Sequence, residues 1–228
     1  TSDVIVTLSS EYGTNLLTIY DIVKKTHCGI KVVECNSEGK FSLDDVEQAL
    51  KSGGTILAVS HVVAQGSIVN PVVELGTLAQ RYNAIYVVDG CQAVGQMKVD
   101  VQEINCCAYV TAGRKWLRGP RGTGLLYIRK NAPIHTPQID LASADLVFDE
   151  SGKVIDVKVR EDAKQFELWE KNTASLLGLA NAIQEYLDYG VEVAAGEICA
   201  KANYIRSCIA ENPNLILVGS ETSTTGVA

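Results

Sequence analysis

The chain has 228 residues, of which 46% are hydrophobic and 21% charged, a composition typical of a globular protein with a sizeable core. Its formal net charge of −7 argues against a nucleic acid or an anionic membrane as partner, although a local basic pocket for a phosphate is compatible with it. The apolar runs are only a few residues long, so neither a signal peptide nor a transmembrane helix is predicted.

The cysteines and histidines bear on redox state and metals. Seven cysteines, an odd number with no C-x-x-C pair, are typical of reduced thiols, so we expect a cytoplasmic protein without disulfides or zinc. The three histidines, His27, His61 and His135, lie far apart and lack metal-ligand spacing, so no metal site is predicted. Residue 1 is not a methionine and falls just before a predicted strand, which favours a segment of a longer protein.

Up to about residue 130, short apolar runs alternate with helical patterns. The runs predict strands at 4–8, 30–34, 55–59, 84–89, 107–111 and 124–128. Helices are predicted over 15–25, after a capping box at Ser42, and after Asn70, which is expected to cap the helix that Pro71 starts. Strands that are apolar on both faces and alternate with helices predict a mixed, mostly parallel sheet covered on both sides, in an α/β three-layer fold.

Beyond residue 140 the pattern changes. Residues 145–160 alternate around a polar turn and predict a hairpin, and two long amphipathic helices follow Asn172. We therefore predict a large domain over residues 1–172, with its N-terminal part missing. Residues 173–228 are expected to hold a linking helix and the truncated start of a small α+β domain.

Three residues that can carry chemistry fall at or just after predicted strand ends: His61, Asp89 and Lys115. Taken singly, each has an ordinary explanation: a structural histidine, a helix-capping carboxylate and a solvated loop lysine. The glycine-rich loop around Lys115 does not match a nucleotide-binding P-loop. Because ligands of such sheets bind beyond the carboxyl ends of the strands, the three together predict one site at that edge.

The conjunction of motifs is more specific than its parts. The chain resembles the class V aminotransferases of pyridoxal-phosphate (PLP) fold type I, a family that includes cysteine desulfurases, isopenicillin N epimerase-like proteins and C–S lyases. The matching segments are S-S-E-Y-G-T-N (9–15), V-S-H-V (59–62), V-V-D-G-C-Q-A-V-G (87–95), G-R-K-W-L-R-G-P-R-G-T-G (113–124) and F-E (166–167).

The resemblance implies roles for five residues. Lys115 would carry PLP as a Schiff base and then move the Cα proton of an amino-acid substrate. Asp89 would pair with the pyridine nitrogen and keep it protonated. His61 would stack on the ring face, Gln92 would donate to the 3-oxygen of the ring, and Arg114 would bind the phosphate. Lys115, His61 and Asp89 are thus the predicted catalytic residues, and all five are predicted to bind the cofactor.

Some positions depart from the family pattern. Ala112 stands where desulfurase-like relatives often place a Ser or Thr that binds phosphate, and Thr111 is an open substitute. Gln165 stands where relatives often carry Arg, and Ala64 where some carry Asn. The resemblance also implies that the arginine for the substrate carboxylate and a desulfurase's nucleophilic cysteine lie beyond residue 228.

The resulting prediction is a PLP-dependent enzyme, a homodimer by family resemblance, that acts on an amino acid, with C–S lyase or cysteine desulfurase-like chemistry favoured. An aminotransferase or epimerase of the same fold, and a non-catalytic truncated relative, are the alternatives. A Mg²⁺- or nucleotide-dependent enzyme using Asp89 is disfavoured, because no phosphate-loop motif accompanies it.

Overall fold

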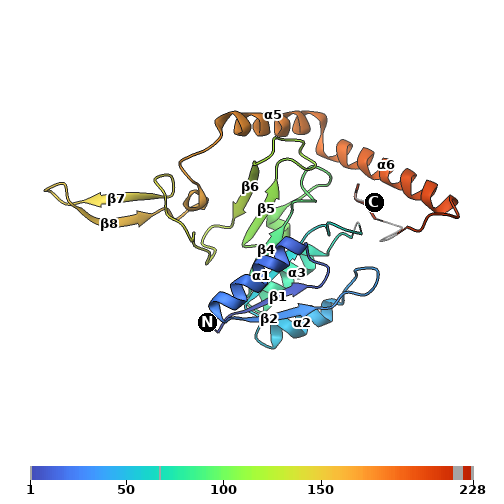
Figure 1. The fold of residues 1–228 in the computed structure, drawn as a ribbon, viewed down its shortest axis with the longest axis horizontal. Coiled ribbons are helices and arrows are strands. Elements are labelled where there is room, and N and C mark those ends of the chain that lie inside the picture. Colours follow the sequence, from blue (N-terminus) through green and yellow to red (C-terminus); the bar gives the residue numbers. More distant parts are fainter. Residues whose placement is uncertain (1, 67, 218–222, 227–228) are drawn as a thin grey trace.

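The computed structural model describes residues 2–66, 68–217 and 223–226, and its centre is a six-stranded sheet in the order β2-β1-β3-β4-β5-β6 (Figure 1). The first five strands run parallel, and β6 is antiparallel to β5. The sheet thus has the mixed, mostly parallel character that the sequence predicts. Its strands are β1 (Val4–Leu8), β2 (Gly29–Val33), β3 (Ile56–Ser60), β4 (Ile85–Asp89), β5 (Ala108–Ala112) and β6 (Gly124–Ile128).

Helices cover both faces of this sheet. Helix α1 (Gly13–Thr26) places Ile19 against Ile5 and Cys28 on one face. The other face carries the main core, made with α2 (Leu43–Lys51), α3 (Val72–Arg81) and the short α4 (Val101–Ile104). The strands of this parallel sheet are apolar on the face that the helices cover. Fully buried side chains of this core come from the strands and from α2 and α3: Val6, Leu8, Leu57, Val88, Val46 and Leu75.

The second part of the chain extends away from the sheet. The hairpin of β7 (Ala144–Phe148) and β8 (Val154–Val159) projects as an arm, and η1 (Ala163–Phe166) leads back from it (Figure 1). Helices α5 (Thr173–Tyr189) and α6 (Val191–Glu211) follow, as the sequence predicts. The domain boundary at 172/173 stays a prediction.

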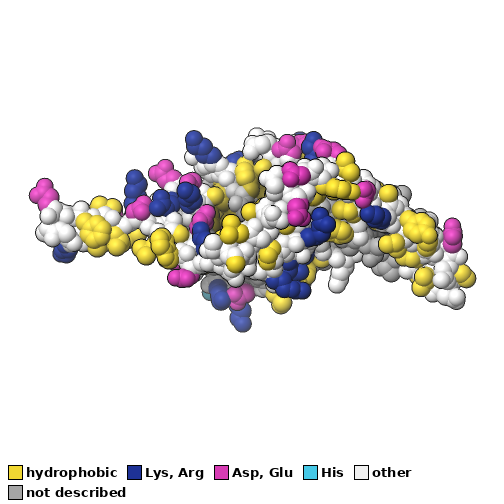
Figure 2. Space-filling view, turned by 90° about the horizontal axis from the view of Figure 1, so that it is seen from above, with side chains coloured by type: hydrophobic (Ala, Val, Ile, Leu, Met, Phe, Trp, Pro, Cys, Tyr) yellow, Lys and Arg dark blue, Asp and Glu magenta, His cyan; other side chains and the backbone are white. Residues whose placement is uncertain are grey.

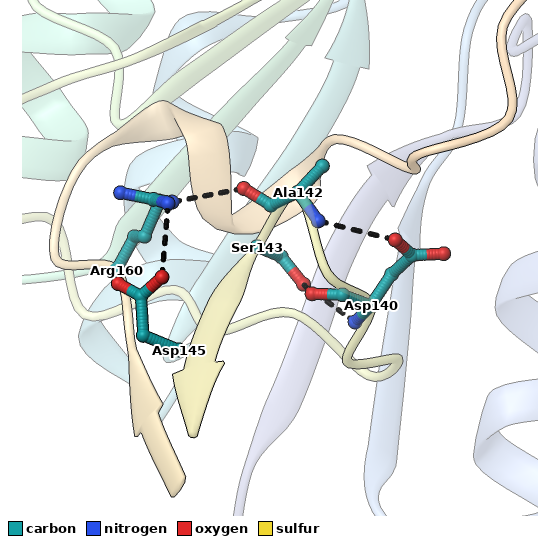
Figure 3. Close-up of polar contacts among 5 residues, drawn as sticks. All are labelled: Asp140, Ala142, Ser143, Asp145 and Arg160. Atoms are coloured by element: carbon teal, nitrogen blue, oxygen red, sulfur yellow. Dashed lines mark hydrogen bonds and ion pairs between the residues drawn. The ribbon is translucent and has the colours of Figure 1, made fainter. Parts of the chain in front are cut away.

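The arm carries apolar side chains at its surface (Figure 2). Leu146, Phe148, Val154, Ile155 and Val157 are all exposed. At its base, Arg160 ties the two strands to the preceding turn, donating from Nε to the Ala142 carbonyl at 2.9 Å and pairing with Asp145 at 3.3 Å (Figure 3). Asp140 makes hydrogen bonds within the same turn, which fix the base of the hairpin, whereas the apolar side chains on the faces of the hairpin are exposed to solvent.

One helix start differs from the prediction. The side chain of Asn70 does not cap α3; its Nδ2 donates instead to the Ser60 carbonyl at 2.7 Å, and its backbone oxygen accepts from Val72. The reason is that Asn70 is buried against the end of β3, where it satisfies a backbone oxygen left free by the end of the strand. The predicted cap at Ser42 is confirmed, since its side chain accepts from the Asp44 amide.

Described helices include none long and apolar enough to cross a membrane.

Two helix-interior glycines are expected to respond in opposite ways to alanine. A Cβ on Gly76 would lie 2.0 Å from the backbone oxygen of Ile104, so Gly76→Ala must push α3 and α4 apart and should lower the free energy of unfolding by about 2 kcal/mol. Gly196 in α6 has open space around it, so Gly196→Ala should raise the free energy of unfolding by about 0.5–1 kcal/mol. Denaturant unfolding of both variants measures this, and equal effects would contradict the described packing.

Candidate functional site

A pocket of about 170 Å³ opens at the carboxyl ends of the parallel strands. Ser60 at the end of β3 pairs with Asp89 at the end of β4, and Asp89 pairs with Val110 in β5, so these strand ends lie side by side. Asp89, Gln92, Arg114 and Lys115 all line the pocket. Four of the five predicted site residues are therefore brought together at the predicted edge of the sheet.

Both carboxylate oxygens of Asp89 receive hydrogen bonds. Asn15 in the first turn of α1 donates from Nδ2 to Oδ2 at 2.8 Å, and the Cys91 backbone amide donates to Oδ1 at 2.8 Å. Asp89 is half-buried, and these donors fix the plane of its carboxylate at the pocket wall.

The Lys115 amine is unpaired in the part of the chain that the structure describes. It makes no hydrogen bond or ion pair there, and its Nζ lies 5.9 Å from the centroid of the Tyr12 ring. The loop that carries it is tightly closed, since Gly113 donates to the Thr123 carbonyl at 2.8 Å and Gly119 to the Gly113 carbonyl at 2.8 Å. A Cβ on Gly113 would approach Thr123 Oγ1 to 2.4 Å, which explains the glycine there.

Gln92 has one end of its amide fixed. Its Oε1 accepts from the Trp116 indole at 3.2 Å, while its Nε2 has no hydrogen-bond partner among the residues described. Arg114 is exposed at the rim. The pocket thus combines a fixed carboxylate, an unpaired primary amine, an amide donor and a guanidinium. This set can bind a ring-shaped ligand that carries polar and anionic substituents.

His61 is placed differently from the other predicted residues. It is buried but does not line the pocket, although its neighbours Ser60 and Val62 do. Its Nδ1 lies 2.8 Å from the Tyr109 hydroxyl, and its backbone amide donates to the Asp89 carbonyl at 2.8 Å. Burial lowers the pKa of the imidazole to about 4, so the ring is neutral at neutral pH. Its predicted stacking on a cofactor ring stays a prediction.

Comparisons with known proteins identify the family of the chain. The profile of the family described as Aminotransferase class-V matches residues 1–227. The chain belongs to the class V aminotransferase family. A relative described as a probable cysteine desulfurase, from Pyrococcus abyssi, is 32% identical over 195 residues, covering 83% of this chain and 46% of that protein. The chain spans about half the length of the curated relatives it matches.

Solved structures support the same family fold. The apo structure of cysteine desulfurase from Thermococcus onnurineus NA1 matches with a TM-score of 0.76 and 28% identity, covering 92% of this chain and 52% of that chain. The cysteine desulfurase CsdA from Escherichia coli matches with a TM-score of 0.84 over 98% of this chain and 55% of that one. At 19% identity the second likeness shows the fold alone.

The departures from the family pattern now have physical explanations. Strand alternation in β5 turns Ala112 toward the pocket and buries Thr111 on the other side, where its hydroxyl has no hydrogen-bond partner among the residues that the structure describes. Thr111 therefore does not replace the missing hydroxyl at the pocket. Gln165 is buried and accepts from the Thr136 amide at 3.0 Å, so it fastens the segment after the hairpin.

Two residues of the site network were quoted in the sequence only as part of a motif. Glu11 is buried, with 8% of its surface exposed, and Asn15 bridges it to Asp89. Tyr109, the partner of His61, was not singled out at all. The signal for Glu11 was an acidic residue three positions beyond a buried strand, but its partners lie too far along the chain to be inferred from spacing.

A second, larger hollow of about 640 Å³ lies between the Lys115 loop and helices α5 and α6. Lys115 and Trp116 line it together with Tyr186, Glu197 and Lys201. It shares Lys115 with the smaller pocket but lacks Asp89, so the smaller pocket is the one that pairs the acid with the amine.

The neutral His61 makes a pH prediction. An unfolded histidine has a pKa near 6.5 and the buried imidazole one of about 4, so the unfolded chain binds more protons between these values. The free energy of unfolding should therefore fall by about 3 kcal/mol, through His61 alone, as the pH drops from 6.5 to about 4. This stability is fully present above pH 6.5. In His61→Asn this contribution to the decrease in the free energy of unfolding should disappear. The control variant His135→Gln, changed at an exposed histidine, should retain it. Denaturant unfolding at several pH values measures the difference, and identical pH profiles for the two variants would contradict a buried neutral ring.

Proposed function

We propose that the protein is a PLP-dependent enzyme in which Lys115 carries the cofactor and Asp89 pairs with its ring nitrogen. The observation that carries the proposal is the pairing of an unpaired amine and a hydrogen-bonded carboxylate in one pocket at the carboxyl edge of the sheet. A structural neighbour of the same fold, at 18% identity, is a C-DES mutant with glycine covalently linked to its PLP cofactor.

The residues of the pocket fit the chemical groups of PLP. A primary amine without an ion-pair partner is what a carbonyl cofactor requires, and a carboxylate beside a pyridine nitrogen favours its protonated form. Gln92 offers a free amide donor for the ring oxygen, and Arg114 a guanidinium for the phosphate. We also propose His61 for the ring face; its buried, neutral imidazole lies between the pocket residues Ser60 and Val62 in sequence but does not itself line the pocket.

The chemistry follows from this assignment. When bound, PLP draws electrons away from the Cα of an amino acid. Lys115 holds and moves the proton at that Cα, because among the described residues it is the one primary amine that lines the pocket with Asp89. Asn15 and the Cys91 amide donate the hydrogen bonds that hold the Asp89 carboxylate at the pocket wall.

The reaction class is proposed from the relatives. Several curated relatives are named cysteine desulfurase or probable cysteine desulfurase, and one structural neighbour is named a cystine C–S lyase. We therefore favour cleavage of a C–S bond in a cysteine-like substrate by the whole protein. Cys91 is not its nucleophile, since burial, together with Asp89, raises the pKa of this pocket thiol to about 12 and keeps it protonated.

The proposal also includes a homodimer, as the family resemblance implies, and a cytoplasmic location. The seven cysteines are all free thiols in the structure, which suits a reducing compartment.

Titration with PLP tests the central assignment. The protein should develop the visible absorbance of lysine-bound PLP, and Lys115→Ala should lose it entirely, because the described lining of the pocket contains no second primary amine beside Asp89. The exposed Lys130→Ala, outside the pocket, is the matched control and should keep the absorbance. A Lys115→Ala protein with unchanged absorbance would overturn the role of Lys115.

A further inference from the structure

A hydrogen-bonded chain leads from Asp89 to the buried carboxylate of Glu11. Asn15 Nδ2 lies 2.8 Å from Asp89 Oδ2 and 3.2 Å from Glu11 Oε1, so one amide nitrogen bridges both acids. The nitrogen has two protons to donate, and an ionised carboxylate has only acceptor atoms. The orientation of the Asn15 amide is therefore determined: its nitrogen faces the acids.

Glu11 receives more hydrogen bonds than the other members of this hydrogen-bonded chain. Its Oε2 accepts from the Ser60 amide at 2.6 Å and its Oε1 from the Tyr12 amide at 2.7 Å, and the Ser60 hydroxyl donates to it as well. With Asn15 it thus faces four donors and no acceptor. A neutral Gln at this position would point an N–H₂ group at one of those donors and lose at least one bond.

The hydrogen-bonded chain joins four segments at or directly behind the pocket wall. Glu11 follows β1, Asn15 is in α1, Ser60 ends β3 and Asp89 ends β4. Both Asn15 and Asp89 line the pocket, whereas Glu11 lies behind them and does not. Among the residues described, the other donor to the Asp89 carboxylate is Cys91, through its amide and its thiol, and Cys91 belongs to the turn directly after β4. Asn15 is therefore the one side chain that fixes the carboxylate from outside its own segment.

We propose that Asn15, oriented by Glu11, is a positioning residue that holds the Asp89 carboxylate in place for the ring nitrogen of the cofactor. This inference rests on the proposed function, because it needs Asp89 to face a pyridine nitrogen. A carboxylate without this bond can rotate about its side-chain torsions and lose the alignment on which a charge-assisted hydrogen bond depends.

A purely structural role for Asn15 predicts something different. In that case the amide would tie α1 to β4, and its loss would weaken every ligand of the pocket alike. The two roles are separated by comparing PLP with an analogue that has carbon in place of the ring nitrogen, since only PLP can use the Asp89 carboxylate.

The experiment measures dissociation constants for PLP and the carbon analogue on the whole protein. Asn15→Ala should weaken PLP binding about tenfold and leave binding of the analogue unchanged, as expected for one hydrogen bond to a charged group. Glu11→Gln should change the ratio of the two constants in the same direction by less. Thr14→Ala, an exposed neighbour in the same helical turn, should change neither constant.

The outcomes separate this inference from the proposed function. Asp89→Ala is measured in parallel and should abolish the preference for PLP over the analogue. If Asp89→Ala abolishes it but Asn15→Ala weakens both ligands equally or neither, the positioning role is wrong and the proposed function stands. If Asp89→Ala leaves the preference intact, the proposed function itself fails. Should Asn15→Ala not fold, Asn15→Ser gives the same ratio, because a hydroxyl has one proton and cannot bridge both acids.

Discussion

The site depends on the parallel alignment of β3, β4 and β5. Because their carboxyl ends meet in register, Ser60, Asp89 and Val110 lie beside one another although they are far apart in sequence. The turn after β4 supplies Cys91 and Gln92 to the pocket, the loop after β5 supplies Arg114 and Lys115, and the start of α1 adds Asn15. An antiparallel neighbour would have sent these segments to the opposite edge, as β6 does.

Differences in burial then give the polar residues distinct properties. His61 is sealed against Tyr109 and loses its charge at neutral pH, whereas Lys115 and Arg114 sit at a partly open pocket. The phenol of Tyr109, whose oxygen lies 2.8 Å from Nδ1 of His61, is buried too, which raises its pKa and keeps it protonated. Burial of Glu11 is tolerated for a different reason: every neighbour that it faces is a donor. Among the residues described, hydrogen bonds and not ion pairs therefore hold the polar side chains of the pocket wall in position.

The sequence allowed much of this arrangement to be predicted. Strand ends could be located from apolar runs, and because the sheet is parallel, Asp89 and Lys115 could be expected at one edge. The mostly parallel character of the sheet and the hairpin followed from the same patterns, whereas the order of the strands within the sheet was not predicted. Contacts that join distant segments could not be predicted: Asn15 reaches Asp89 across 74 positions, and Asn70 serves β3 instead of capping its own helix. A local sequence pattern cannot show which of two polar groups a buried amide will bind, because tertiary packing determines which group lies within hydrogen-bond distance.

The most direct test of the central claim is chemical fixation of the bound cofactor. The protein is incubated with PLP, reduced with borohydride, digested, and the modified peptide is identified by mass spectrometry. The account predicts that PLP is attached to the peptide that contains Lys115, and that the attachment is lost in Lys115→Ala. Attachment at a different lysine in the unsubstituted protein, or no attachment at all, would contradict it.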